Sequence, residues 1–293
     1  MCAVGPELMV NKSDGDGMEA EFVVNHMVAP ALDVPRFFDL AAGLGCRGVE
    51  IRNDLGGDVV AGGLAAAEVA RLAADRGLTI LSINALQRFN DWTGDRAREA
   101  RALAEYAGRC GARALVLVPV NDAGWMPPLA ERRAGLRRAL SGLAPILAEA
   151  GILGLVEPLG FEICSLRSKR EALDAIDELG LAGRFRLVHD TFHHHLAGEG
   201  ELFPDRTGLV HISGVEDRTV PLARLLDAHR VLVGPADLIG NADQIRVLRA
   251  GGYRGPLSFE PFAASVQADP DIAGALRASM AHLAPALART AAE

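Results

Sequence analysis

The sequence lacks several features that would mark particular classes of protein. No apolar run reaches the roughly 18 residues of a membrane-spanning helix, so no membrane segment is expected. The four cysteines are scattered without a C-x-x-C pair, which gives no sign of a disulfide framework and favours a reduced, cytoplasmic setting. Basic residues are in the minority, with 30 Lys and Arg against 38 Asp and Glu, so the phosphate attraction that dominates nucleic-acid binding is absent.

The chain has 293 residues and no segment that reads as a linker between domains. Residues 1–20 lack the apolar centre of a signal peptide and are expected to form a flexible leader. Residues 21–293 are expected to form one folded unit. This length fits a single α/β barrel, since such barrels commonly reach about 250 residues, and 49% hydrophobic residues are enough for a sizeable core.

Eight short apolar runs recur along the chain, each continuous rather than alternating with polar residues. They are FVVN (22–25), GVEI (48–51), TILSIN (79–84), ALVLVP (114–119), ILGLVE (152–157), FRLVHD (185–190), GLVHI (208–212) and PLSFE (256–260). Runs of this kind are typical of strands buried on both faces. Segments with helical character separate most of them, at 33–43, 64–76, 95–110, 128–150, 168–180, 241–250 and 269–291, whereas the segment after the sixth run shows little helix signal.

The alternation of strands and helices predicts parallel strands joined by right-handed crossovers. Eight such units predict an α/β fold of the closed (β/α)₈ type, a single TIM barrel. The alternative is an open doubly wound sheet, which usually carries a glycine-rich phosphate turn after its first strand. The segment FVVNHMVAPALDV (22–34) has no such turn, which favours the barrel.

The last four predicted strands each end in a side chain that can bind a metal. These residues are Glu157, Asp190, His211 and Glu260. Active sites of barrels lie at the carboxyl ends of the strands, and a buried charge is costly unless it is paired or bound to a metal. The set suits one divalent ion, with Mn²⁺, Zn²⁺, Co²⁺ and Mg²⁺ all compatible; a buried network of ion pairs is the alternative.

The histidine-rich stretch RLVHDTFHHHLAG (186–198) contributes only part of this site. His189 lies inside the strand beside Asp190, so alternation turns it away from the site and predicts a packing role. His193, three residues after Asp190, is expected to face the mouth as a substrate contact or as a support for the ligands. His194 and His195 are expected to be loop residues.

Eight stretches, taken in order, resemble a known family over residues 22–290. They are GVEIRND (48–54), LSINALQRFN (81–90), LVLVPV (115–120), VEPLGFEIC (156–164), HDTFHHHLAG (189–198), VHISGVED (210–217), HRVLVGPADLI (229–239) and LSFEPF (257–262). They resemble the sugar isomerase and epimerase branch of the xylose isomerase-like barrels, and most of all the inosose isomerases of myo-inositol catabolism.

The resemblance implies a metal-dependent isomerase that converts 2-keto-myo-inositol through an enediolate. It places the metal ligands on Glu157, Asp190, His211 and Glu260, and a histidine of the family on His193. It also implies an arginine that contacts substrate, for which Arg218 and Arg230 both qualify.

Several roles are expected from this chemistry. Glu157 and Glu260 are the candidate base and acid, since carboxylates on two sides of the substrate can move the proton. Asn84 ends the third predicted strand and can bind a hydroxyl group, and Trp92 either covers the apolar face of the sugar or anchors a loop. Glu50 and Arg52 end the second strand, where one of them faces the pocket or the two form an ion pair.

Other outcomes use the same metal site. An inosose dehydratase, a ketose 3-epimerase and a hydroxypyruvate isomerase all begin with proton abstraction beside a carbonyl, and a metal-dependent polyol-binding protein would keep the site without turnover. An apurinic endonuclease is disfavoured, because the segments EIRND, SINAL and VPVND lack the extra histidines of that branch. The expected partner is a small ketose or inosose without phosphate; the alanine-rich outer helices fit a homodimer or a lone barrel equally.

Overall fold

Eight parallel strands close into a barrel in the order of the sequence, from β1 to β8 and back to β1. The structure is a computed structural model that describes residues 22–55, 57, 59–125 and 127–287; the leader expected at 1–20 lies outside this part of the chain. The strands are β1 (Phe22–Asn25), β2 (Gly48–Arg52), β3 (Thr79–Leu86), β4 (Ala114–Leu117), β5 (Leu153–Val156), β6 (Phe185–Asp190), β7 (Thr207–Ile212) and β8 (Leu257–Phe259). The predicted single TIM barrel is confirmed.

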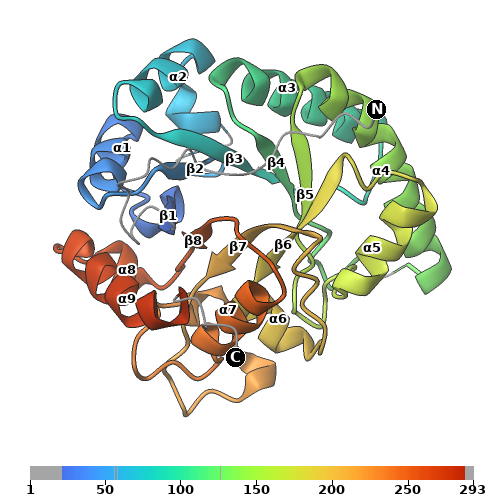
Figure 1. Cartoon of the computed structure of the whole chain (residues 1–293). Helices are drawn as coiled ribbons and strands as arrows, with labels where there is room; N and C mark the ends of the chain where they lie inside the picture. The colour runs from blue at the N-terminus through green and yellow to red at the C-terminus, as the bar shows by residue number, and fades with distance from the viewer. Residues whose placement is uncertain (1–21, 56, 58, 126, 288–293) are drawn as a thin grey trace.

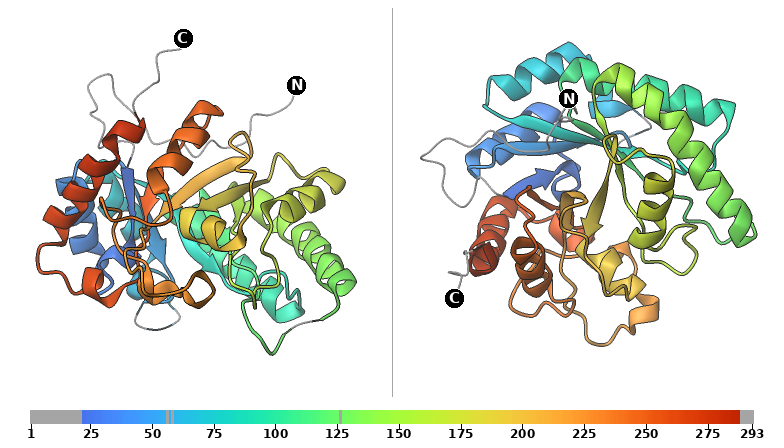
Figure 2. Two further views of the ribbon diagram at one scale, coloured as in Figure 1. Left: turned by 90° about the horizontal axis from the view of Figure 1, so that it is seen from below. Right: turned by 45° about the vertical axis from the view of Figure 1, so that its right-hand side comes forward.

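The helices surround the strands, as Figures 1 and 2 show from three directions. They are α1 (Val34–Gly43), α2 (Ala66–Ala74), α3 (Gly94–Cys110), α4 (Leu129–Ala150), α5 (Lys169–Glu178), α6 (Thr191–Ala197), α7 (Asn241–Ala250), α8 (Ala264–Gln267) and α9 (Ile272–Leu287). Short 3₁₀ turns lie at His26–Val28, Val60–Gly63, Leu222–Arg224 and Asp227–His229. None of the helices in the described part of the chain has the length and apolar character required to span a bilayer.

The histidine run is helical, which corrects the expectation of a loop at His194 and His195. Both residues lie in α6, a seven-residue helix that follows β6 directly. The Asp190 side chain caps its first turn by accepting from the His193 backbone N–H, and Gly198 ends it in the left-handed conformation at φ 65°. The sequence pattern does not reveal this helix for two reasons. Seven residues are too few to show a periodic apolar face, and the residue that caps the helix is also the last residue of β6.

Two apolar cores lie on the two sides of the sheet. One fills the space between strands and helices and includes Val156, Val210, Ile212 and Phe259 together with helix residues such as Leu143. The other lies inside the barrel and is built almost wholly from strand residues. The described cysteines, Cys46, Cys110 and Cys164, are buried.

Alternation along the strands connects the inner core to the polar residues above it. Leu155, Val188 and Leu209 belong to the inner core, and two positions further along each strand come Glu157, Asp190 and His211. Residues two apart in a strand share a face. The strand-end polar residues therefore point into the barrel, directly above a dry apolar layer.

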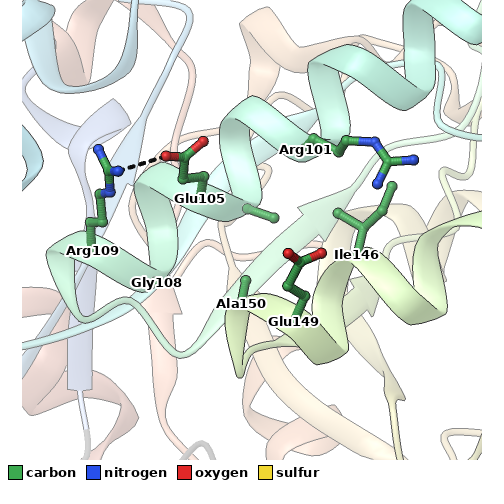
Figure 3. A pocket seen from close by; sticks show the side chains of 8 residues that line it. Arg101, Glu105, Gly108, Arg109, Ile146, Glu149 and Ala150 are labelled. Carbon is green, nitrogen blue, oxygen red and sulfur yellow. Dashed lines mark ion pairs between the residues drawn. The ribbon is translucent and has the colours of Figure 1, made fainter.

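A groove on the outer surface lies between α3 and α4 and encloses about 440 Å³ (Figure 3). It is lined by residues from the last turns of both helices, including Gly108 and Ala150, and an ion pair joins Arg109 to Glu105 at its side. Because each helix runs antiparallel to its strand, these last turns lie at the amino ends of the strands. The groove is thus at the opposite end of the barrel from the strand-end polar residues.

Gly160, in the connection between β5 and α5, allows α6 to pack closely. A Cβ added there would overlap the His193 carbonyl oxygen and come within 2.5 Å of the Leu196 Cβ. We expect Gly160→Ala to destabilise the protein by about 1–3 kcal/mol, the usual cost of overpacking. Gly183→Ala is the matched control, because no heavy atom lies within 4 Å of a Cβ there. Urea unfolding measures both, and an equal effect of the two substitutions would contradict the role of Gly160.

Candidate metal centre

Glu157, Asp190, His211 and Glu260 converge at the carboxyl end of the barrel. Each offers one ligand atom, and these atoms all lie within 4.8 Å of one another. Nδ1 of His211 lies 2.8 Å from Oε1 of Glu157, 3.2 Å from Oε2 of Glu260 and 4.0 Å from Oδ2 of Asp190. All four residues are buried. The barrel thus brings together the four polar residues at or next to the ends of the last four apolar runs.

Asp190 has a different partner for each of its carboxylate oxygens. Oδ1 accepts the His193 backbone N–H at 2.9 Å and so caps α6. Oδ2 faces the cluster, where Nη2 of Arg230 donates to it at 2.6 Å. The start of α6 therefore fixes the orientation of the carboxylate that completes the site.

Arg230 reaches the cluster from the irregular segment between β7 and α7. Its Nη2 also donates to Oε2 of Glu260 at 3.1 Å, and its Nε donates to Ser213 Oγ at 2.9 Å. The guanidinium carbon lies 4.6 Å from the ring centroid of Phe262 and 5.2 Å from that of Phe192. Such aromatic contacts stabilise a desolvated cation. Of the two arginines that the sequence offers, Arg230 lies against the ligands, whereas Arg218 is exposed.

Glu260 is the most heavily hydrogen-bonded carboxylate of the four ligand candidates. Its Oε1 accepts from Nη1 of Arg52 at 2.9 Å, from Nδ2 of Asn25 at 3.2 Å and from Nδ2 of Asn84 at 3.2 Å. The sequence predicts Asn84 as a residue that binds a substrate hydroxyl, from its position at the end of a strand. In the structure its side-chain amide contacts Glu260. Asn25 and Arg52 join it from β1 and β2.

A fourth acidic residue, Glu50, lies beside the cluster and is fully buried. Nε2 of His211 lies 3.1 Å from one of its oxygens and 3.2 Å from the other. Ser82 Oγ donates to Glu50 at 2.5 Å, and Ser258 Oγ donates to it as well. The sequence leaves open whether Glu50 or Arg52 faces the pocket or whether the two form an ion pair. In the structure Glu50 contacts His211 and Arg52 contacts Glu260. A sequence signal for the buried position of Glu50 is present in Ser82 and Ser258, the serines that interrupt the apolar runs 79–84 and 256–260.

The cluster carries an excess of negative charge. The carboxylates of Glu50, Glu157, Asp190 and Glu260 are buried together, with the guanidinium groups of Arg52 and Arg230 as their buried partners. With His211 neutral, four negative charges face two positive ones. Buried charge without compensation is strongly unfavourable, so this excess favours further positive charge at the site.

The pKa values of these groups reflect that imbalance. Burial lowers the pKa of His211, but Glu260, Glu50 and Glu157 outweigh this and raise it well above its ordinary value. Burial raises the pKa of Glu157 to about 7, even though His211 opposes the shift. For Glu260 the effect of burial is overcome by His211, Arg230 and Arg52, and its pKa falls well below its ordinary value. In the metal-free protein a proton on His211 supplies part of the missing positive charge.

The donor set fits a divalent cation. One ion would supply two positive charges, and three carboxylates with one imidazole are ligands that Mn²⁺, Zn²⁺, Co²⁺ and Mg²⁺ accept to different degrees. His211 offers Nδ1 to the cluster while its Nε2 faces Glu50, the arrangement typical of a metal-binding histidine with a carboxylate behind it.

Two other predicted site residues have separate surroundings. His193 is buried in α6, with its ring 5.0 Å from that of Phe161 and 5.3 Å from that of Phe192. Its Nδ1 is buried and has no hydrogen-bond partner among the described residues. Trp92 packs against α4, where its indole would overlap a Cβ added to Gly142. This contact gives Trp92 an anchoring role in the packing of the loop.

The comparisons with known proteins agree with this geometry. Residues 38–286 match the family described as xylose isomerase-like TIM barrel. The chain belongs to this family. No curated protein sequence matches the chain.

Solved structures of similar fold superpose on most of the chain. A xylose isomerase domain-containing protein from Salmonella typhimurium LT2 is 34% identical, with a TM-score of 0.80, over 92% of this chain and 96% of that one. The IolI protein with a bound zinc atom is 19% identical, with a TM-score of 0.77, over 91% and 98%. L-ribulose 3-epimerase is 18% identical, with a TM-score of 0.71, over 92% and 94%. The last two show a shared fold.

Metal binding is expected to release protons near neutral pH. Without metal, the raised pKa values keep His211 protonated and Glu157 partly protonated at about pH 6 to 7. A metal binds only their deprotonated forms, so affinity for Zn²⁺ should rise as pH increases through this range. Calorimetry in two buffers with different ionisation enthalpies measures the protons released. A binding enthalpy that is independent of the buffer would contradict this protonation state of the site.

Proposed function

We propose that the protein is a divalent-metal-dependent isomerase of an unphosphorylated polyol ketone, with 2-keto-myo-inositol as its substrate. The observation that carries the proposal is the arrangement of Glu157 and Glu260. These carboxylates come from the ends of β5 and β8, and both lie beside His211 and Asp190 in one buried cluster. Two carboxylates that reach a common point from different strands suit the removal and return of a proton.

The family supports this class of reaction. Structures with the same fold include L-ribulose 3-epimerase and a D-psicose 3-epimerase with D-tagatose, both of which act on ketoses by name. The zinc-bound IolI protein supports a metal in a barrel of this fold. The choice of 2-keto-myo-inositol rests on the sequence resemblance to inosose isomerases.

The reaction moves a hydrogen between adjacent carbons of a hydroxyketone through an enediolate. A divalent cation, when bound by the four ligands, would stabilise the negative charge that develops on the substrate oxygens. Glu157 is the candidate proton acceptor, because burial raises its pKa toward neutrality in the protein without metal. Glu260, held by Arg52 and Arg230, approaches from the other side as the second proton-transfer group.

Polar groups around the cluster would orient the substrate. His193 lies three residues after Asp190, and its buried Nδ1 has no partner among the described residues. The side-chain amide of Asn84 contacts Glu260. Each can bind a hydroxyl group of a polyol. Arg230 supplies a fixed positive charge that favours an enediolate over the neutral ketone.

Glu260→Gln tests the proton-transfer roles. The amide keeps the size and one coordinating oxygen of the side chain but has lost its basicity. We expect metal to be retained more weakly and turnover to fall by about 10²–10⁴-fold, the range for loss of a general acid or base. Turnover should be measured with the metal content of each sample known. Near-normal turnover of a metal-loaded variant would remove Glu260 from the mechanism.

Proton NMR in D₂O with 2-keto-myo-inositol tests the function directly, on protein loaded with Mg²⁺ or Zn²⁺. A new inosose carrying deuterium at the adjacent carbon is the expected result. Loss of water would indicate an inosose dehydratase, and inversion at one carbon an epimerase. Absence of both exchange and product, with metal bound, would contradict the proposed substrate and favour another ketose or a binding role.

A further inference from the structure

Glu50 is an acidic residue of the site that lies outside the four ligand candidates, and like Glu157 it accepts no hydrogen bond from an arginine within the described part of the chain. It is fully buried in the second strand, and its partners are two serine hydroxyls, one asparagine amide and the imidazole of His211. A carboxylate in such a position is costly to bury. A glutamate at this buried position therefore indicates a specific role that an apolar residue could not fill.

The register of the barrel fixes the position of Glu50. Asn25 of β1 and Ser82 of β3 are its neighbours in the sheet, and Ser258 of β8 is the neighbour of His211. All these side chains share the inward face at one level of the barrel. Ser82 and Ser258 each donate to a different oxygen of Glu50, and Nδ2 of Asn25 adds a longer contact of 3.4 Å. The carboxylate is therefore held on both sides, with His211 as its remaining partner.

The two nitrogens of His211 face different chemical surroundings. Nε2 lies 3.1 Å from a Glu50 oxygen, whereas Nδ1 faces Glu157, Asp190 and Glu260. A neutral imidazole carries one proton. When a cation binds between Nδ1 and the three carboxylates, that proton is on Nε2, where Glu50 accepts it. The lone pair is then on Nδ1 and points toward the three carboxylates. The opposite tautomer would set a lone pair of Nε2 against the carboxylate of Glu50 and leave Nδ1 unable to bind a cation.

We propose that Glu50 is a positioning residue that fixes the Nε2-protonated tautomer and the ring orientation of His211 for metal binding. The inference rests on the metal site of the proposed function and adds a residue outside the four ligands. Residues behind metal ligands typically change affinity by about 10–100-fold when they are replaced. Glu50 acts through His211 and does not itself contact the substrate.

The test is the affinity of purified full-length protein for Zn²⁺, measured by competition with a chromophoric chelator. Glu50→Gln preserves the shape of the side chain and removes its charge; we expect its affinity to fall by about 10–100-fold. Glu199→Gln is the matched control, because Glu199 is a partly buried glutamate that accepts hydrogen bonds at the start of α5 from Ser168 and Lys169. The affinity of the Glu199→Gln variant for Zn²⁺ should equal that of the wild type.

Long-range proton–nitrogen NMR of the zinc-loaded wild type supplies a readout that a merely structural role would not affect. We expect His211 to show a protonated Nε2 and a zinc-bound Nδ1, a result that requires no folded variant. Zinc on Nε2, or a Glu50→Gln affinity equal to that of the wild type, would overturn the role of Glu50 and leave the metal site standing. A wild type that binds no divalent ion would overturn both.

Discussion

Burial of four carboxylates in one small volume is the constraint on which the rest of this structure depends. Glu50, Glu157, Asp190 and Glu260 lie above the apolar interior of the barrel, where water does not solvate them. Their mutual repulsion must be offset by cations and hydrogen-bond donors. Part of this compensation comes from two buried arginines, two asparagine amides and two serine hydroxyls. With His211 neutral, the remaining excess of negative charge equals the charge of one divalent ion.

The barrel tolerates such a cluster because it separates the cluster from the groups that stabilise the fold. Outward-facing residues such as Val156 and Val210 pack against helices, whereas inward-facing residues two positions apart belong in turn to the apolar layer and to the site. The polar groups are thus concentrated at one end of the strands, and the apolar contacts extend over both faces of the sheet. His189 shows the same rule in reverse, since it points outward to Gln244 of α7 while Asp190 points inward.

Local periodicity in the sequence predicts the strands, most of the helices and the four ligand candidates, because each ligand lies at or next to the end of an apolar run. Contacts between residues far apart in the sequence are not predictable in this way. Glu50 and His211 are brought together only by closure of the barrel. The choice of Arg230 over Arg218 depends on an isolated bridge between Gly214 and Val231, in a segment without periodicity. The sequence does not predict the helix α6, because Asp190, the residue that caps it, is itself a ligand candidate at the end of a strand.

The central claim, that the inward-facing residues of the last four strands bind one divalent cation, is tested most directly by anomalous X-ray diffraction from crystals grown with Mn²⁺ or Zn²⁺. We predict a single strong anomalous peak at coordination distance from Glu157, Asp190, Glu260 and Nδ1 of His211. A peak elsewhere, with the four side chains still paired to one another and to Arg230, would contradict this claim.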